Sequence, residues 1–98
     1  MKDLISNINK LFESRVRLGI MSVLMVNENY DFNSLKKALN VTDGNLASHL
    51  KALEENGIIR VNKQFIGRKP NTSYSVTELG VELFKQHLQA LEKLIKRQ

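Results

Sequence analysis

The feature that most constrains the fold of this chain is a change of hydrophobic period at Asn56-Gly57. Before this point, two short segments carry apolar residues at helical spacing, and only a tight turn at Asn40-Val41 separates them. After it, Ile58–Phe65 is β-branched and apolar with interleaved polar residues, and Thr72–Val76 resembles it. This order predicts a helix-turn-helix followed directly by a β-hairpin.

Residues at the predicted helix ends support this interpretation. Asp31 is suited to cap the first short helix and Thr42 the second, because their side-chain oxygens can accept free backbone N–H groups. Gly57 suits the left-handed position after the second helix. The first helix carries the apolar residues Phe32, Leu35, Ala38 and Leu39. In the second helix Leu46, Leu50 and Leu53 are expected to face the core.

Further helices are predicted on either side of this centre. Lys2–Phe12 has one apolar face, and Ser14–Val26 is apolar on several sides, which places it inside the core. Asn27–Tyr30 is interpreted as a polar break, and Thr77 caps a long final helix over residues 78–97. The fold class is therefore mainly α with a small β-hairpin. It is a winged helix-turn-helix with additional N- and C-terminal helices, in a single domain over residues 1–98.

Composition narrows the possible functions. The chain has no cysteine, which excludes a disulfide framework, a thiolate metal site and a cysteine nucleophile. Its most apolar run, Leu18–Val26, is far shorter than a membrane span, and we expect a cytoplasmic protein without a membrane partner. Lys and Arg outnumber Asp and Glu 15 to 10, a balance that favours a polyanionic partner.

The helix over Asp43–Asn56 is the first candidate DNA-binding element. Its side opposite the leucines presents Gly44, Asn45, Ser48, Lys51 and Ala52, which are mostly small or hydrogen-bonding. Small side chains let a helix approach base edges in a major groove, where Asn pairs with adenine and Lys reaches guanine or phosphate. The helix N-terminus, with the Thr42 hydroxyl, suits a phosphate. The alternative is an ordinary solvated face, which would usually carry more Glu and Lys pairs.

The turn of the predicted hairpin is the second candidate element. Arg68 and Lys69 are adjacent cations that cannot cover core surface there, and Lys63 and Asn71 lie nearby on the strands. Arginine can enter a narrow minor groove, and lysine can clamp a phosphate. The alternative is a solubilising turn. Arg15 and Arg17 could also reach phosphates, although Arg17 could equally pair with an acidic neighbour.

The two histidines do not indicate a metal site or a catalytic centre. His49 flanks the leucine stripe, which favours a packed residue with one hydrogen bond over a DNA contact, although it stays a candidate. His87 lies inside the final helix and is interpreted as structural. The sequence has no nucleophile beside a base, no paired carboxylates and no glycine-rich phosphate loop. We therefore expect no enzyme activity, no metal and no cofactor.

The final helix predicts a homodimer. Its apolar positions spread over about 200° of the helical wheel, whereas packing on a small domain needs about 100°. The excess surface should meet a second copy, with the first helix as another contributor, although one broad intramolecular face is the alternative. The candidate dimer residues are Leu4, Ile8 and Leu11 in the first helix, and Phe84, Leu88, Leu91 and Ile95 in the last.

Four segments of the chain, which occur in the same order as in the family, resemble parts of ArsR- and MarR-like winged-helix regulators. Asn45–Ile59 is similar to their recognition helix and first strand, and Arg17–Leu24 to their core helix. Gly67-Arg68-Lys69-Pro70 is similar to their wing, and Thr72–Gly80 to the start of their last helix. Leu39–Leu46 is similar to the turn of minimal stand-alone members. The chain departs from metal-sensing members, because it has no cysteine motif.

This resemblance implies homodimers on pseudo-palindromic operators, with the helix in the major groove and the wing in the minor groove. Any small-molecule effector would bind at the dimer interface, and the sequence does not identify one. The leading hypothesis is a sequence-specific double-stranded DNA-binding regulator, most readily a repressor. The alternative is a winged-helix protein-interaction module without DNA binding. That module should have an apolar or acidic recognition face and no paired cations at the wing tip. Double-stranded RNA binding is a more distant option.

Overall fold

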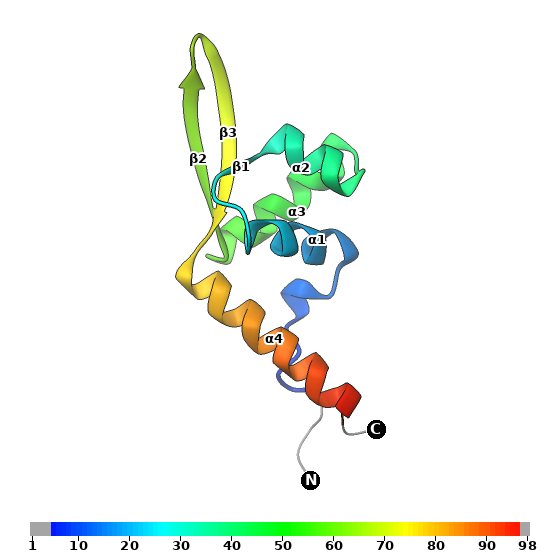
Figure 1. Ribbon diagram of the computed structural model, residues 1–98. Helices are drawn as coiled ribbons and strands as arrows, with labels where there is room; N and C mark the ends of the chain where they lie inside the picture. Colours follow the sequence, from blue (N-terminus) through cyan, green and yellow to red (C-terminus); the bar gives the residue numbers. More distant parts are fainter. Residues whose placement is uncertain (1–4, 97–98) are drawn as a thin grey trace.

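The computed structural model describes residues 5–96 and contains the predicted helix-turn-helix and hairpin (Figure 1). The three-stranded antiparallel sheet has the order β1-β3-β2. The elements in chain order are η1 (Lys10–Phe12), α1 (Arg15–Leu24), β1 (Tyr30–Asp31), α2 (Phe32–Leu39), α3 (Asp43–Glu55), β2 (Ile59–Ile66), β3 (Lys69–Val76) and α4 (Glu78–Lys96).

The helix ends follow the local signals in the sequence. Asn40 ends α2 in the left-handed conformation with φ 53°, and Gly57 follows α3 with φ 74°. The predicted caps are confirmed by hydrogen bonds from backbone N–H groups to their side-chain oxygens. Asp31 accepts from Ser34 at 3.1 Å, Thr42 from Asn45 at 3.2 Å and Thr77 from Gly80 at 2.9 Å. These bonds satisfy helix donors that have no intrahelical partner.

One core joins the helices to the sheet. Leu46, Leu50 and Leu53 of α3 are buried as predicted, and α1 lies in the middle of the core with Ile20, Met21 and Leu24. The other buried members of the hydrophobic cluster are Phe12, Leu35, Ile58, Ile59, Tyr74 and Phe84. The apolar stripe of α3 is therefore committed to the core, and its other side remains available at the surface.

The predicted N-terminal helix is wrong for the described residues. Residues 5–7 form a turn, and only the single 3-10 turn η1 follows, so Ile8 and Leu11 are not on a continuous helix. Asn9 is extended, and its backbone N–H donates to Nδ1 of His87 on α4 at 3.0 Å. An α-helix would need that N–H internally, and the contact with α4 takes it instead. Leu4 lies outside the described residues.

The polar break after α1 contains a strand that the sequence pattern did not predict. Tyr30 pairs with Tyr74 and Asp31 with Ser73, which adds β1 to the edge of β3. Asn29 precedes it with a positive φ of 51°, a conformation that asparagine tolerates better than most residues. The hairpin is therefore part of a three-stranded sheet.

The molecule is elongated, with principal extents of 58 × 25 × 21 Å. The hairpin tip and the C-terminal end of α4 lie at opposite ends (Figure 1). No helix within residues 5–96 is long and apolar enough to span a membrane.

Candidate nucleic-acid interface

The outer side of α3 carries most of the residues predicted to read DNA. Gly44, Asn45, Ser48 and Lys51 are all exposed, and within residues 5–96 no hydrogen bond or ion pair holds the side chains of Asn45, Ser48 or Lys51. No atom lies within 4 Å of where a Cβ on Gly44 would be, so the backbone is open there. Thr42 is also exposed, and its oxygen accepts the Asn45 N–H. The face is therefore small, polar and free to contact a ligand.

A salt bridge neutralises the one acidic residue in the first turn of α3. Lys36 Nζ lies 2.7 Å from Oδ1 of Asp43, with side chains 43% and 70% exposed. An exposed pair like this adds little stability. The pair also places a positive charge beside Asp43, which would offset the repulsion between its carboxylate and a phosphate. Lys36 lies outside the predicted site, since the pair joins two helices whose relative position the sequence does not give.

His49 takes the packed role that its position on the helix favours. It is half-buried, and its Nδ1 accepts a hydrogen bond from Nε of Arg17 at 3.0 Å. Burial lowers the pKa of His49, and the positive charge of Arg17 lowers it further. His49 is thus neutral near pH 7, with its proton on Nε2. Arg17 also donates to the Leu11 carbonyl oxygen at 3.5 Å, so in this structure it binds neutral partners.

The hairpin ends in a two-residue turn that displays its cations. Ile66 and Lys69 are the last paired residues, which leaves Gly67 and Arg68 at the tip. Gly67 has φ 65° while Arg68 has no positive φ, the pattern of a type II′ turn. Lys63, Arg68 and Lys69 are exposed, and Asn71 is half-buried on β3. Glycine at the tip therefore sets the turn that places two cations at the end of the hairpin.

The fold brings α3 and the hairpin tip to one side of the molecule. In Figure 1 the hairpin projects upward beside α2 and α3, while α4 passes below all three. The N-terminal end of α3 and the tip thus both lie away from α4. This arrangement combines an exposed polar helix face with a projecting cationic hairpin.

The described residues of the predicted dimer interface divide into three groups by their exposure. Phe84 is only 5% exposed and packs edge-to-face on Phe12, with ring centroids 5.1 Å apart, so its ring belongs to the core of its own chain. The sequence could not show this, because Phe12 approaches α4 from the far end of the chain. Leu88 and Ile95 are 45% and 75% exposed. Ile8, Leu11 and Leu91 are half-buried.

His87 is structural, as predicted. It is 2% exposed, lies beside the rings of Phe12 and Phe84, and accepts the Asn9 N–H on Nδ1. Burial lowers the pKa of His87, and nearby Glu13 opposes this more weakly. Within residues 5–96, no group of three or more His, Cys, Asp or Glu side chains is arranged to hold a metal ion.

We expect the protein to lose stability on acidification through His87. Because the folded-state pKa of His87 is below the ordinary value of 6.5, the unfolded chain binds the proton first as pH falls. The stabilisation of the folded state by neutral His87 is therefore complete above pH 6.5 and is lost as the pH falls through the lower folded-state pKa. Urea unfolding between roughly pH 7.5 and pH 5.5 should show this decline, and His87→Gln, which does not titrate, should weaken it.

His49→Gln is the matched control, because the pKa of His49 is lowered as well. It should remove a smaller part of the pH dependence, since His49 is less buried than His87. Identical pH profiles of stability for the His87→Gln variant and the wild-type protein would show that His87 does not cause the loss of stability at acidic pH.

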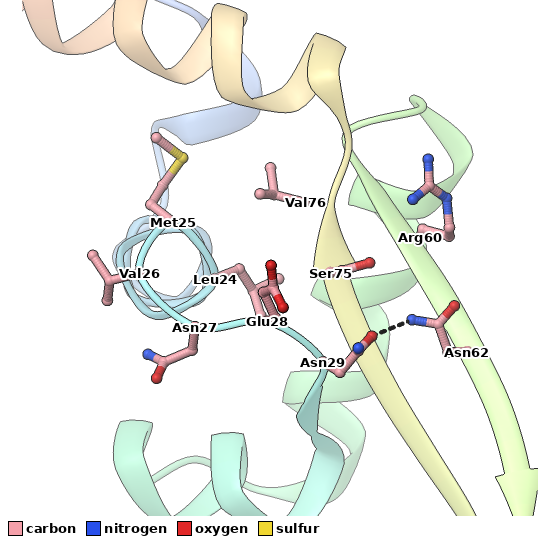
Figure 2. A pocket seen from close by; sticks show the side chains of 10 residues that line it. All are labelled: Leu24, Met25, Val26, Asn27, Glu28, Asn29, Arg60, Asn62, Ser75 and Val76. Carbon is pink, nitrogen blue, oxygen red and sulfur yellow. Dashed lines mark hydrogen bonds between the residues drawn. The ribbon is translucent and has the colours of Figure 1, made fainter.

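A surface hollow lies at the base of the hairpin, away from its tip. It has a volume of about 650 Å³. Figure 2 shows the apolar Leu24 and Val26 at the end of α1 and the polar Arg60 and Asn62 on β2. Asn62 donates a hydrogen bond to Asn29 at 2.8 Å, which ties the loop after α1 to the sheet. None of the residues that line this hollow belongs to α3 or to the hairpin tip.

Comparisons with known proteins agree with this geometry. Residues 16–95 match the model of a family described as winged helix DNA-binding domain. An uncharacterized protein of Methanocaldococcus jannaschii is 40% identical over 87 residues, covering 89% of this chain and 95% of that protein.

Solved structures share the fold. A transcriptional regulator homologue from Pyrococcus horikoshii OT3 is 33% identical with a TM-score of 0.84, covering 95% of this chain and 90% of that one. The transcriptional repressor CouR, solved on a 23-mer DNA duplex, is 14% identical with a TM-score of 0.76, covering 92% of this chain and 63% of that one, and it shows the fold alone. MarR-family regulators are among the other structures with this fold. The predicted resemblance to winged-helix regulators is thus confirmed, and the chain belongs to the family of winged helix DNA-binding domains.

Proposed function

We propose that this protein is a homodimeric transcriptional regulator that binds double-stranded DNA sequence-specifically and acts as a repressor. In this proposal α3 enters the major groove and the hairpin tip enters the adjacent minor groove. The supporting observation is that α3, whose outer residues are polar and exposed, and the hairpin, whose turn carries Arg68 and Lys69, both lie away from α4 (Figure 1).

The residues on α3 have distinct roles in this proposal. Asn45 pairs with adenine through its amide, Ser48 donates to or accepts from a base edge, and Lys51 reaches guanine or a phosphate. A phosphate binds at the N-terminus of α3, where the Thr42 hydroxyl hydrogen is available to donate. His49 offers its Nε2 hydrogen to a neighbouring phosphate.

The homodimer follows from the exposed apolar residues of α4. Among the described residues Leu88 and Ile95 are 45% and 75% exposed, and the half-buried Leu91 lies between them in the sequence. Exposed apolar residues that share one helix can mark an interaction surface. A two-fold axis through α4 would place both recognition helices on the side away from it. The repressor role is proposed from the resemblance of the sequence to ArsR- and MarR-like regulators, and the fold shared with CouR, a repressor solved on DNA, is compatible with it.

Selection of binding sites from random duplexes, followed by footprinting, tests the proposal. A homodimer should select inverted half-sites about 34 Å apart, one helical turn of DNA. The logarithm of the binding constant should fall linearly with the logarithm of the salt concentration. Sedimentation should give a dimer. A flat salt dependence, or selection that enriches no sequence, would overturn the proposed function.

Replacing Asn45 with alanine should relax base choice at one position in each half-site. The expected loss of discrimination is roughly 1–3 kcal/mol there, because the amide that reads the base edge is removed. Gln89→Ala removes an exposed amide from α4 and is the matched control. Selection with both variants measures the effect, and an unchanged preference for Asn45→Ala would remove this residue from base reading.

A further inference from the structure

Two large apolar side chains near the tip of the hairpin are exposed to solvent. Phe65 is 73% exposed and Ile66 is 63% exposed. Both lie at the end of β2, where the strand extends beyond the hydrophobic core. The core residues on the sheet that lie nearest the tip are Tyr74 and its partner Val61, which is partly buried. The projection of the hairpin past the helices is plain in Figure 1. No part of the domain described here covers these side chains.

The two side chains point to opposite faces of the hairpin. Alternation along β2 puts Phe65 on the same face as the buried Ile59, the face turned toward the helices. Phe65 pairs across the strands with Pro70, so an apolar pair occupies that face near the tip. Ile66 pairs with Lys69 on the other face. The tip is therefore apolar on both faces and cationic at its end.

The charge of the hairpin indicates the kind of partner that covers this apolar surface. Between Asn56 and Thr77 the sequence has four basic residues, Arg60, Lys63, Arg68 and Lys69, and no Asp or Glu. Two such hairpins repel each other, which argues against contact between copies at the tip. A polyanion complements this charge, and the walls of a DNA minor groove also offer apolar deoxyribose surface.

We propose that Phe65 and Ile66 form an apolar wedge that packs against the deoxyribose walls of the minor groove. This inference rests on the proposed function and adds a contact that does not depend on charge. Where apolar side chains in this groove also press between base steps, they partly unstack the bases and bend the duplex toward the major groove. The hairpin then deforms its DNA, and sites that bend easily, such as those with TA or CA steps, bind better.

The test is Phe65→Thr, in which the β-branched threonine keeps the strand propensity. The probe is a short mixed-sequence duplex with a fluorophore at each end, titrated over a range of salt concentrations. We expect at least a 10- to 100-fold loss of affinity, because each of the two hairpins in the dimer loses one buried phenylalanine, with an unchanged salt slope because no cation is lost. Energy transfer between the two fluorophores should report a smaller bend than with the wild-type protein.

Val26→Thr is the matched control, because Val26 is an equally prominent apolar residue, 80% exposed, that follows α1 near the base of the hairpin and away from its tip. It should leave affinity and bend unchanged. If Phe65→Thr and Ile66→Thr bind and bend the duplex like wild type, the wedge is wrong and the proposed function stands. A change of oligomeric state in these variants would assign the side chains to contact between copies, which also overturns the wedge. If wild type does not bind the duplex at any salt concentration, the proposed function fails as well.

Discussion

Replacing Gly80 with alanine is expected to lower the free energy of unfolding by about 3 kcal/mol or more, because a methyl group has no room there. A Cβ on Gly80 would meet the carbonyl oxygen of Ile58, with Cγ2 of Val76 only 2.8 Å away. The Ile58 carbonyl oxygen also accepts hydrogen bonds from the backbone N–H of Thr77, at 3.0 Å, and from its hydroxyl. Because that backbone is held in place, α4 would have to move off the sheet.

This expected result runs against helix propensity, since alanine in a helix is favoured over glycine by about 1 kcal/mol. The measurement is urea unfolding, with a fall in Tm of about 12 °C or more as a second readout. Gly44→Ala is the matched control, because Gly44 also lies in the first turn of its helix and no atom would touch its Cβ. It should leave the free energy of unfolding unchanged or raise it. Equal stability of the two variants would contradict the close packing of α4 against Ile58.

The parts of the fold that could be predicted are those set by neighbouring residues. Asp31 and Thr42 cap their helices through bonds to residues three positions ahead, and Asn40 and Gly57 end helices through their own backbone preferences. The leucine stripe of α3 needed only the 3.6-residue period. These signals sufficed for the helix-turn-helix and the hairpin, and hence for the choice of candidate DNA-binding residues.

The parts that could not be predicted depend on contacts between distant residues. The apolar period before Phe12 favoured a helix, but the hydrogen bond from Asn9 to His87 joins residues 78 positions apart and breaks it. β1 has two residues, too few for any period, and it forms only because the edge of β3 is available to Tyr30. The burial of Phe84 depends on Phe12 in the same way.

The candidate site shows the same division. The exposure of Asn45 and Ser48 could be predicted from the helical wheel, and that of Arg68 from the turn. The exposure of Phe65 could not, since an apolar residue in a strand ordinarily indicates the core. One signal was present: Phe65 and Ile66 are adjacent, and neighbouring strand residues cannot both face the same side.

Replacing both Arg68 and Lys69 with alanine is expected to weaken binding to every duplex about a hundredfold or more near physiological salt. In the proposed homodimer two hairpins each lose two phosphate-binding cations. Each contact contributes about 0.9 to the salt slope, so the slope should fall by about three to four. Both side chains are exposed, and β2 and β3 remain paired up to Ile66, so the fold should persist. The base preference that α3 reads in the major groove should not change, because phosphate contacts carry no sequence information.

The matched control removes the same charge from the opposite end of the molecule. Lys85 and Lys93 are exposed on α4, and replacing both with alanine also lowers the net charge of the chain by two, from +5. If binding depended only on net charge, both double variants would weaken it alike. Contact through the hairpin predicts a lower slope for the Arg68 and Lys69 variant alone, measured by fluorescence anisotropy over a salt series. Equal salt slopes for the two variants would show that the hairpin does not contact the DNA and that α3 alone binds it.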